Sequence, residues 1–485
     1  MMLTFIFNIE NPVKVFAMLA KHMVLFVIVC ALQATAHAQP APETALPSTP
    51  EASPAAAEAS PAAAVPGPAV TLPASTGPEV LLPTEVAAAL PDAEAAAEPA
   101  ARRQPNAVPS EANVRQPDAE VSSTHIGGYA ELHLNMERIS GPGSRETTVD
   151  FHRFVLFLAH EFTESIRFYS ELEVEHAVAS SDPKDPGEVE IEQAYVDYLL
   201  ADKALGLRAG LVLVPMGIIN QWHEPPVFHG VERPMVDTVI IPTSWREAAV
   251  GVFGEPIEGL RYQLYAMSGL SAAGFSASDG IAEGRTETAE APADGLAVAA
   301  RVEYEPSPGL VAGVSAYGGL AGPNAEFFDA SGTPGDLNVP VLGVAADARG
   351  RVAGFEARAE LAYFHIGNTR ALRNTADEKG INLGLDVGAA IYGLYGEVAY
   401  DVLHSLEMEP QLLPFVRVER YDTMASVSGR PHAASDNAFG VTELALGLSY
   451  KPVPQLAFKS DLRFSNPDGP TKANGRFDLG LGVMF

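Results

Sequence analysis

The chain has 485 residues, 47% of them hydrophobic, and a formal net charge of −30. This acidic excess argues against a nucleic-acid partner, because phosphate backbones are bound mainly through lysine and arginine. Beyond the amino-terminal segment there is no apolar run of 18 residues. A membrane protein of this composition must therefore cross the bilayer as a closed sheet of strands.

Residues 1–38 are predicted to be a cleaved signal peptide. An apolar run from Met23 to Leu32 follows a basic residue and precedes the small-residue segment Ala36–Ala38, with Met18 as an alternative start. Cys30 lies within this run, and a lipoprotein anchor there is the less favoured alternative. Cleavage after residue 38 leaves no cysteine, so no disulfide, thiolate metal site or cysteine nucleophile is expected.

Residues 39–123 are predicted to be a disordered linker. Alanine and proline dominate the segment to about residue 100, and frequent prolines prevent a continuous helix. A simple spacer and a tether that crosses the periplasm or touches the cell wall both remain open.

Residues 124–485 are predicted to form an all-β fold, a 16-stranded antiparallel transmembrane β-barrel. Apolar and polar residues alternate in segments about ten residues long, as lipid on one side and water on the other require. Short and long connections alternate, which a soluble sandwich would not explain. Tyr392–Gly393 could be a further turn, but the long connection that follows would then lie on the wrong side, so 383–403 is interpreted as one strand. The short turns are predicted at 164–165, 201–204, 255–258, 305–308, 349–351 and 451–454, and the long loops near 138–147, 177–187, 214–244, 270–293, 319–338, 366–380, 422–438 and 465–475.

One face of each predicted strand carries charged or aromatic residues that we expect to line the pore, because a lipid-facing Arg or Lys at the bilayer midplane costs ~2–4 kcal/mol. The orientation of the strand 149–159 is left open, since both of its faces are apolar near its centre. The predicted pore-lining residues are Tyr129, Glu131, His133, Glu137, Arg167, Tyr169, Glu171, Glu173, Glu175, Glu188, Glu190, Glu192, Arg208, Arg261, Arg301, Glu356, Arg358, Glu360, Arg417 and Glu419.

These charges have two compatible interpretations: an Arg–Glu network that stiffens the wall, or a field that sorts permeating ions. Residues 124–485 hold 49 acidic and 26 basic residues, a net charge of −23. An acidic lumen concentrates cations and repels anions, although part of this charge belongs to external loops.

The longest predicted loop, 214–244, is richer in apolar and aromatic residues than the other loops. Folding into the barrel mouth would bury these side chains and narrow the pore; packing against a neighbouring subunit or over the rim is the alternative. A zinc motif at His223 and His229 is disfavoured because the spacing is six rather than four and Pro225–Pro226 break a helix, so no metal is expected. The predicted constriction residues are Asn220, Trp222, His223, Glu224, His229, Glu232, Arg233 and Asp237.

The last strand alternates throughout, and it ends on an aromatic residue, as do strands that carry the assembly signal of outer-membrane barrels. The residues assigned to this signal are Phe477, Leu479, Leu481, Val483 and Phe485.

Several segments resemble the phosphate-selective porin O and P family over most of residues 126–485. They are Leu207–Gly210 with Pro215–Gly217, Val231–Pro234, Arg246 with Gly251–Val252, and Phe415–Asp422. The resemblance implies a 16-stranded, trimeric, passive channel with an inward-folded third loop. The family's namesakes have linings rich in lysine and arginine for anions, whereas this barrel is acidic, so we expect preference for cations or neutral solutes over phosphate.

The predicted function is a passive diffusion porin of the bacterial outer membrane that needs no cofactor and catalyses no reaction. Its expected partners are outer-membrane lipid, the barrel assembly machinery, further copies of the chain in a homotrimer, and small solutes or ions. The alternative is an anchor or adhesin barrel that displays its loops. Sixteen strands favour the channel, because small anchor barrels fill their interior with side chains. An embedded hydrolase is disfavoured because no Ser/His/acid set falls on one lumen face.

Overall fold

The computed structural model describes residues 124–485 apart from gaps at 139–144, 178–186, 202, 289–290, 292–294, 322–326, 329–336, 375, 378–385, 407, 434–435 and 470–473. The predicted signal peptide and linker lie outside the described residues.

Sixteen strands form a closed antiparallel barrel in which each strand pairs with its neighbour along the chain and β1 pairs with β18. The predicted fold class and strand number are therefore confirmed. The barrel strands are β1 (Thr124–Arg138), β2 (Arg145–Glu161), β3 (Ile166–Glu175), β4 (Val189–Leu199), β5 (Gly206–Leu213), β6 (Arg246–Ile257), β7 (Leu260–Ser268), β8 (Leu296–Ser307), β9 (Leu310–Ala321), β11 (Val339–Val352), β12 (Phe355–Ile366), β14 (Ala390–Tyr400), β15 (Gln411–Ser426), β16 (Gly440–Val453), β17 (Leu456–Pro467) and β18 (Asn474–Met484).

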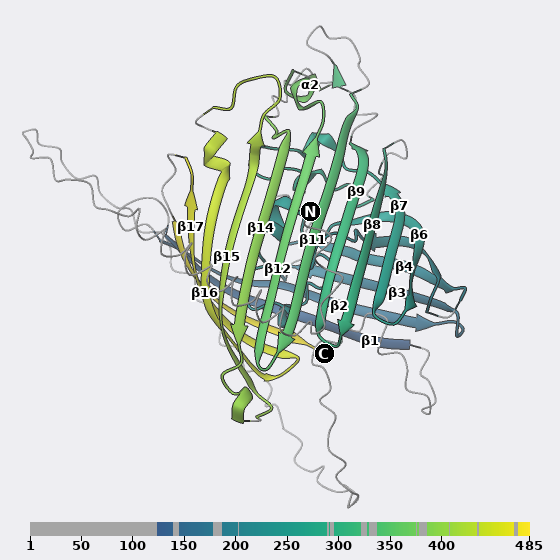
Figure 1. The fold of residues 1–485 in the computed structure, drawn as a ribbon, viewed down its shortest axis with the longest axis vertical. Coiled ribbons are helices and arrows are strands. Elements are labelled where there is room, and N and C mark those ends of the chain that lie inside the picture. Colours follow the sequence, from purple (N-terminus) through teal and green to yellow (C-terminus); the bar gives the residue numbers. More distant parts are fainter. Residues whose placement is uncertain are drawn as a thin grey trace, which may run out of the picture. The chain divides into compact units, whose positions relative to one another are not determined.

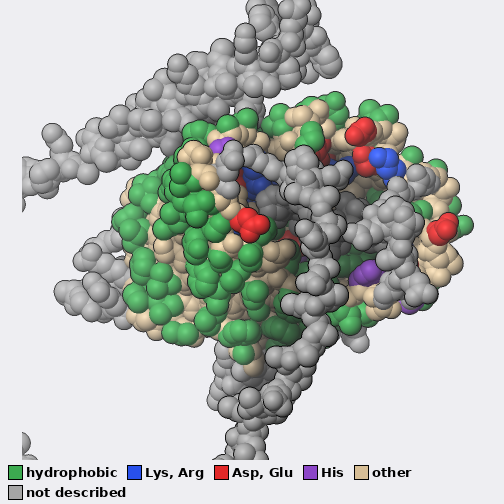
Figure 2. All heavy atoms as spheres, turned by 90° about the horizontal axis from the view of Figure 1, so that it is seen from below, with side chains coloured by type: hydrophobic (Ala, Val, Ile, Leu, Met, Phe, Trp, Pro, Cys, Tyr) green, Lys and Arg blue, Asp and Glu red, His purple; other side chains and the backbone are tan. Residues whose placement is uncertain are grey.

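The two faces of the wall differ in polarity, as the period of two requires. In β8, Val298 and Val302 are about half exposed, whereas Arg301 and Glu303 on the opposite face are buried. Leu479 of β18 is exposed and Asp478 is buried in the same way. Hydrophobic side chains consequently cover much of the described outer surface (Figure 2). The described residues include no helix that is both long and apolar enough to cross a membrane.

The short turns lie at one end of the barrel, together with the carboxy terminus (Figure 1). Four were predicted a few residues too early, because the strands continue through 255–257, 305–307, 349–352 and 451–453. Three of these four hairpins turn at glycines with positive φ: Gly259 (78°), Gly309 (81°) and Gly354 (82°). Glycine adopts this conformation without strain, so it marks the turn better than the nearby prolines do.

The long connections lie at the other end and carry short helices, such as α2 in Figure 1. The helical segments are η2 (Pro225–Val227), η3 (Val236–Ile240, one π-turn), η4 (Ala272–Gly274), η5 (Ala282–Gly284), α2 (Thr369–Asn374) and η7 (Asp436–Phe439), with η6 (His404–Leu406) in the connection between β14 and β15. A two-residue pair, β10 (Phe327–Phe328) with β13 (Ala376–Asp377), stands outside the barrel.

The strand β14 passes through Tyr392–Gly393 without a turn, and it spans Ala390–Tyr400 rather than the longer 383–403. The orientation of β2, which the sequence left open, is also resolved. Val155 and Phe157 are buried on its inner face, whereas Leu156 and Leu158 are exposed.

Candidate functional site

The connection between β5 and β6, residues 214–245, folds into the barrel and is here called the inner loop. Asn220 ties its two ends together: the side-chain amide donates to the carbonyls of Val214 (2.7 Å) and Trp245 (3.2 Å) and accepts from the Trp245 N–H (2.6 Å). The two ends of the loop are therefore held next to each other where they join the wall.

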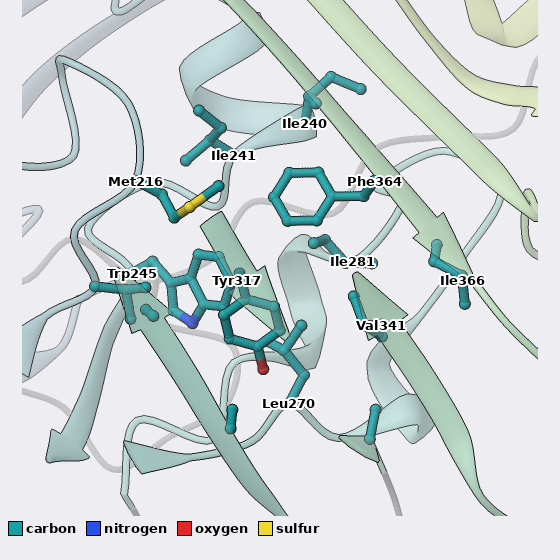
Figure 3. Packing of buried hydrophobic residues seen from close by; sticks show 14 of the residues in the cluster. Met216, Ile240, Ile241, Trp245, Leu270, Ile281, Tyr317, Val341, Phe364 and Ile366 are labelled. Carbon is teal, nitrogen blue, oxygen red and sulfur yellow. The ribbon is translucent and has the colours of Figure 1, made fainter. Parts of the chain in front are cut away.

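An apolar cluster joins the inner loop to the wall. In Figure 3, Met216, Ile240, Ile241 and Trp245 of the inner loop lie among Tyr317, Val341, Phe364 and Ile366 of the strands and Leu270 and Ile281 of the next long connection. The Trp245 and Tyr317 rings are 4.8 Å apart. The apolar composition that set this loop apart in the sequence thus corresponds to real burial.

Glycines on the inner face of the wall make room for the loop. A Cβ at Gly482 would lie 2.3 Å from Pro225, and one at Gly480 would lie 2.9 Å from Val231. A Cβ at Gly393 would lie 2.9 Å from both Ile240 and Val236. These positions face inward by strand alternation, so a side chain there would displace η2 or η3.

Carboxylates of the wall bind backbone N–H groups of the inner loop. Glu360 accepts from Ile218 (3.0 Å) and Asp461 accepts from Val231 (2.6 Å). Irregular loop segments leave N–H groups unpaired, and their burial is unfavourable unless an acceptor is supplied. These acids therefore hold the loop in place as well as contributing charge.

Basic side chains bind the loop carbonyls in the same way. Lys451 donates to the Pro226 carbonyl (2.7 Å) and Lys459 to the Gly230 carbonyl (2.9 Å). The Lys459 ammonium also lies 3.7 Å from the centre of the Phe228 ring, a cation–π contact.

On β14–β17, here called the arginine wall, buried acids and guanidiniums alternate. Arg417 donates to Glu419 (2.9 Å) and lies 3.4 Å from Glu397. Arg463 donates to Glu443 through its Nε (2.7 Å) and lies 3.9 Å from Glu419. Each buried carboxylate named here therefore has a buried cation beside it.

On β3–β4, here called the glutamate wall, acids outnumber bases. Glu171, Glu173 and Glu192 are all buried. Arg153 of β2 lies 3.4 Å from Glu173, and His223 of the inner loop lies 3.4 Å from Glu192 and 3.6 Å from Glu171.

A third anchor lies where β1 and β18 meet. The Glu232 carboxylate accepts from Asn135 (2.8 Å) and Arg476 (2.5 Å) and lies 3.4 Å from His133. One loop residue therefore joins the first and last strands of the barrel.

The predicted pore-lining residues fall into three groups by exposure, and many of the buried ones bind each other or the inner loop. Buried residues are Tyr129, Glu131, His133, Glu171, Glu173, Glu192, Arg208, Arg301, Glu356, Glu360, Arg417 and Glu419; partly exposed ones are Arg167, Tyr169, Glu175, Glu190, Arg261 and Arg358; exposed ones are Glu137 and Glu188. Glu188 precedes β4 and so was wrongly placed within a strand.

Of the predicted constriction residues, two are partly exposed and the rest buried. Trp222 and Glu232 are the partly exposed ones, and the guanidinium of Arg349 lies 4.0 Å above the Trp222 ring. The buried ones are Asn220, His223, Glu224, His229, Arg233 and Asp237.

A β-bulge changes which residues of β4 face inward, so simple alternation does not predict all of them. The register shifts opposite Glu171 and Leu172, so Glu192 and its neighbour Gln193 both face inward, and Gln193 donates to Glu171 (2.6 Å). Beyond the bulge the parity is reversed, and Asp197 pairs with Arg208 at 2.7 Å. No sequence signal marks this shift.

Lys451 was wrongly assigned to a turn. It lies in β16 and faces inward, where it is buried. Lys459, by contrast, could have been found, because Ala457, Lys459, Asp461 and Arg463 share one face of a regular strand.

The connection between β15 and β16 carries a separate ionic cluster. Arg430 forms two hydrogen bonds with Asp436 (2.7 and 2.8 Å) and one with Asp386 (2.6 Å). The hydrogen bonds from Arg430 lower the pKa of Asp436 to about 2. This cluster joins two of the long connections.

The closed 16-stranded antiparallel barrel is similar in fold to a solved porin. Salmonella typhi OmpF, in a complex with daunomycin, aligns with a TM-score of 0.50 and 10% identity over 75% of this chain and 97% of its own. The anion-selective porin of Comamonas acidovorans aligns with a TM-score of 0.47 and 11% identity, covering 75% of this chain and 99% of that one.

In sequence, the chain is 33% identical over 346 residues to an uncharacterized protein of Aquifex aeolicus (strain VF5), a match that covers 69% of this chain and 74% of the relative. The chain belongs to the same family as that protein. No protein-family model matches it.

Proposed function

We propose that the protein is an outer-membrane porin, a passive diffusion channel for small hydrophilic solutes or ions. The observation that carries this proposal is a closed 16-stranded barrel with an apolar outer face and a charged inner face, partly crossed by the inner loop. A barrel of this strand number is wide enough for a water-filled path. Such a channel needs no cofactor and catalyses no reaction.

The same proposal covers the environment and the partners of the barrel. The apolar outer face suits outer-membrane lipid, the last strand with Phe477, Leu481 and Phe485 suits the barrel assembly machinery, and the family resemblance favours a homotrimer. Delivery by a cleaved signal peptide belongs to the same proposal.

We further propose that the channel favours cations or neutral solutes over phosphate. The barrel's net charge of −23 supports this preference, as does the excess of acids on the glutamate wall. The acids best placed to meet a passing ion are the exposed or partly exposed Glu175, Glu188 and Glu190.

Single-channel recording of the purified protein in a planar bilayer tests the function, and the reversal potential in a KCl gradient tests the selectivity. We expect discrete ohmic steps and a potential of the sign set by K⁺ permeation. A triple variant, Glu175, Glu188 and Glu190→Gln, should shift the potential toward chloride, whereas Glu258→Gln, in the β6–β7 turn, should not. A folded barrel that gives no single-channel current steps would refute the assignment as a porin. A wild-type channel that selects chloride or phosphate would refute the proposed preference for cations or neutral solutes.

A further inference from the structure

Three residues meet where the inner loop touches the glutamate wall: Glu171 of β3, Glu192 of β4 and His223 of the inner loop. One oxygen or nitrogen atom from each lies within 4.8 Å of the other two. All three residues are at least 97% buried. Glu192 faces inward by regular alternation, and the bulge in β4 brings the next residue, Gln193, to the inner face opposite Glu171.

The separations are too long for good hydrogen bonds. His223 Nε2 lies 3.4 Å from a Glu192 oxygen and 3.6 Å from a Glu171 oxygen, whereas N–H···O bonds are centred at about 2.9 Å. Four ligands at about 2.0–2.1 Å from a tetrahedral Zn²⁺ are separated from one another by about 3.3–3.5 Å. The two separations from His223 Nε2 therefore lie close to the edge length of such a coordination shell.

Unpaired polar atoms point the same way. Both ring nitrogens of His223 and both carboxylate oxygens of Glu192 are buried, and they have no hydrogen-bond partner among the described residues. Buried polar atoms are normally paired, because leaving one unpaired costs about 1–3 kcal/mol, and more if it is charged. A cation bound between the two side chains would contact Nε2 of His223 and the oxygens of Glu192 together.

The local charge also favours a cation. Glu173 adds a third buried carboxylate to Glu171 and Glu192, and its guanidinium partner is Arg153, at 3.4 Å. Glu171 is oriented by Gln193, which donates to its other oxygen at 2.6 Å. A hydrogen bond of this kind fixes the direction of a metal-binding carboxylate.

A neighbouring cluster around Asp150 is held by hydrogen bonds and so differs from a metal site. Asp150 accepts from His152 at 3.0 Å and from His176 at 2.9 Å, and Arg153 donates to the other nitrogen of His152 at 3.0 Å. These are ordinary hydrogen-bond lengths, and the guanidinium opposes a second cation. The cluster of Asp150 therefore carries no metal proposal.

We propose that Glu171, Glu192 and His223 bind a divalent first-row metal ion, of the Zn²⁺ type, that joins the inner loop to the glutamate wall. One imidazole and two carboxylates suit this class of ion, with water free to complete the shell. The centre requires the folded barrel and loop but does not depend on which solute the barrel passes.

The test is metal uptake by the whole protein. The barrel is unfolded, stripped with a chelator, refolded in detergent with Zn²⁺ or Co²⁺, and freed of loose metal by gel filtration. We expect about one equivalent of metal by elemental analysis and the visible absorption of four-coordinate Co²⁺. His223→Ala and Glu192→Gln should each lower the affinity for the metal by a factor of roughly ten or more.

His229→Ala is the matched control. His229 is also a buried histidine of the inner loop, 3.4 Å from Glu356, and its replacement should leave uptake unchanged. Glu192→Gln is nearly isosteric and serves if His223→Ala does not fold. The proposal would be overturned by a refolded wild-type barrel that retains no metal after gel filtration. It would also be overturned by a His223→Ala barrel that keeps the wild-type Co²⁺ spectrum.

Discussion

The arginine wall and the glutamate wall hold the same loop by different chemistry. On the arginine wall, Arg417 and Arg463 lie between the carboxylates, so the buried charge is compensated within the wall. On the glutamate wall, Glu171 and Glu192 face His223 across distances longer than a hydrogen bond. The first wall carries its own guanidinium cations, whereas on the second wall we propose that a bound metal ion supplies the cation.

Not every charged residue on the inner face of the barrel is available to a permeating ion. A residue such as Glu360 or Asp461 faces inward, yet its carboxylate binds a backbone N–H of the inner loop. Its charge is therefore part of the structure that positions the loop. Acids that are at least partly exposed, such as Glu175 and Glu188, are better placed to act on ions.

The largest effect is expected from breaking the compensated wall. Arg417→Met leaves Glu397 and Glu419 without their shared guanidinium, and loss of one partner from a buried ionic network costs about 3–5 kcal/mol. The midpoint of urea unfolding in detergent should fall accordingly.

Arg420→Met is the matched control for this variant. Arg420 lies on the same strand but is partly exposed and pairs with Asp468, so its loss should cost about 0–1 kcal/mol. Equal destabilisation by the two variants would show that the buried network has no special role.

A smaller effect is expected from filling the space that the inner loop occupies. In Gly393→Val, the new side chain overlaps Val236 and Ile240 of η3, which should cost about 1–3 kcal/mol and displace the loop. Single-channel conductance should change while the barrel remains folded. Gly396→Val, on the opposite face of the same strand, meets no atom within 4 Å at its Cβ and should behave as wild type. Similar conductance changes in both variants would argue against a packed loop.

Regular alternation in the sequence was enough to predict the number of strands and the direction of most side chains. The alternation of Phe477, Leu479 and Leu481 with Asp478 in β18 is an example, because each residue lies on the face that its polarity predicts. The period of two is a local property of the sequence, so it can be recognised without knowing the rest of the fold.

Features that depend on tertiary context were not predictable. The bulge at Glu192 reverses the parity of the rest of β4, and the partners of the inner loop, such as Asp461 for Val231, are 230 residues away. One turn was placed at the prolines of 305–308 and another at Gly350, although Gly309 and Gly354 are the glycines with positive φ.

The smallest effect is expected outside both walls. Asp436→Asn removes the hydrogen bonds that lower the pKa of Asp436 to about 2. Since the folded pKa lies below the ordinary value, the carboxylate stabilises the loop above about pH 4, and this contribution disappears as the pH falls through about 2. The partly exposed Arg430 limits it to about 0–1 kcal/mol. The variant should unfold as wild type below pH 2 and slightly more easily at pH 7; a gap that persists at pH 2 would contradict the ionic origin.

Removal of the inner loop is the most direct test of the proposed channel. Replacing Asn220–Asp237 with a short Gly/Ser linker should raise the unit conductance in a planar bilayer, because the segment lies across the barrel interior, while the heat-modifiable barrel still forms. An unchanged unit conductance in a correctly folded variant would contradict the proposal that the inner loop narrows the channel.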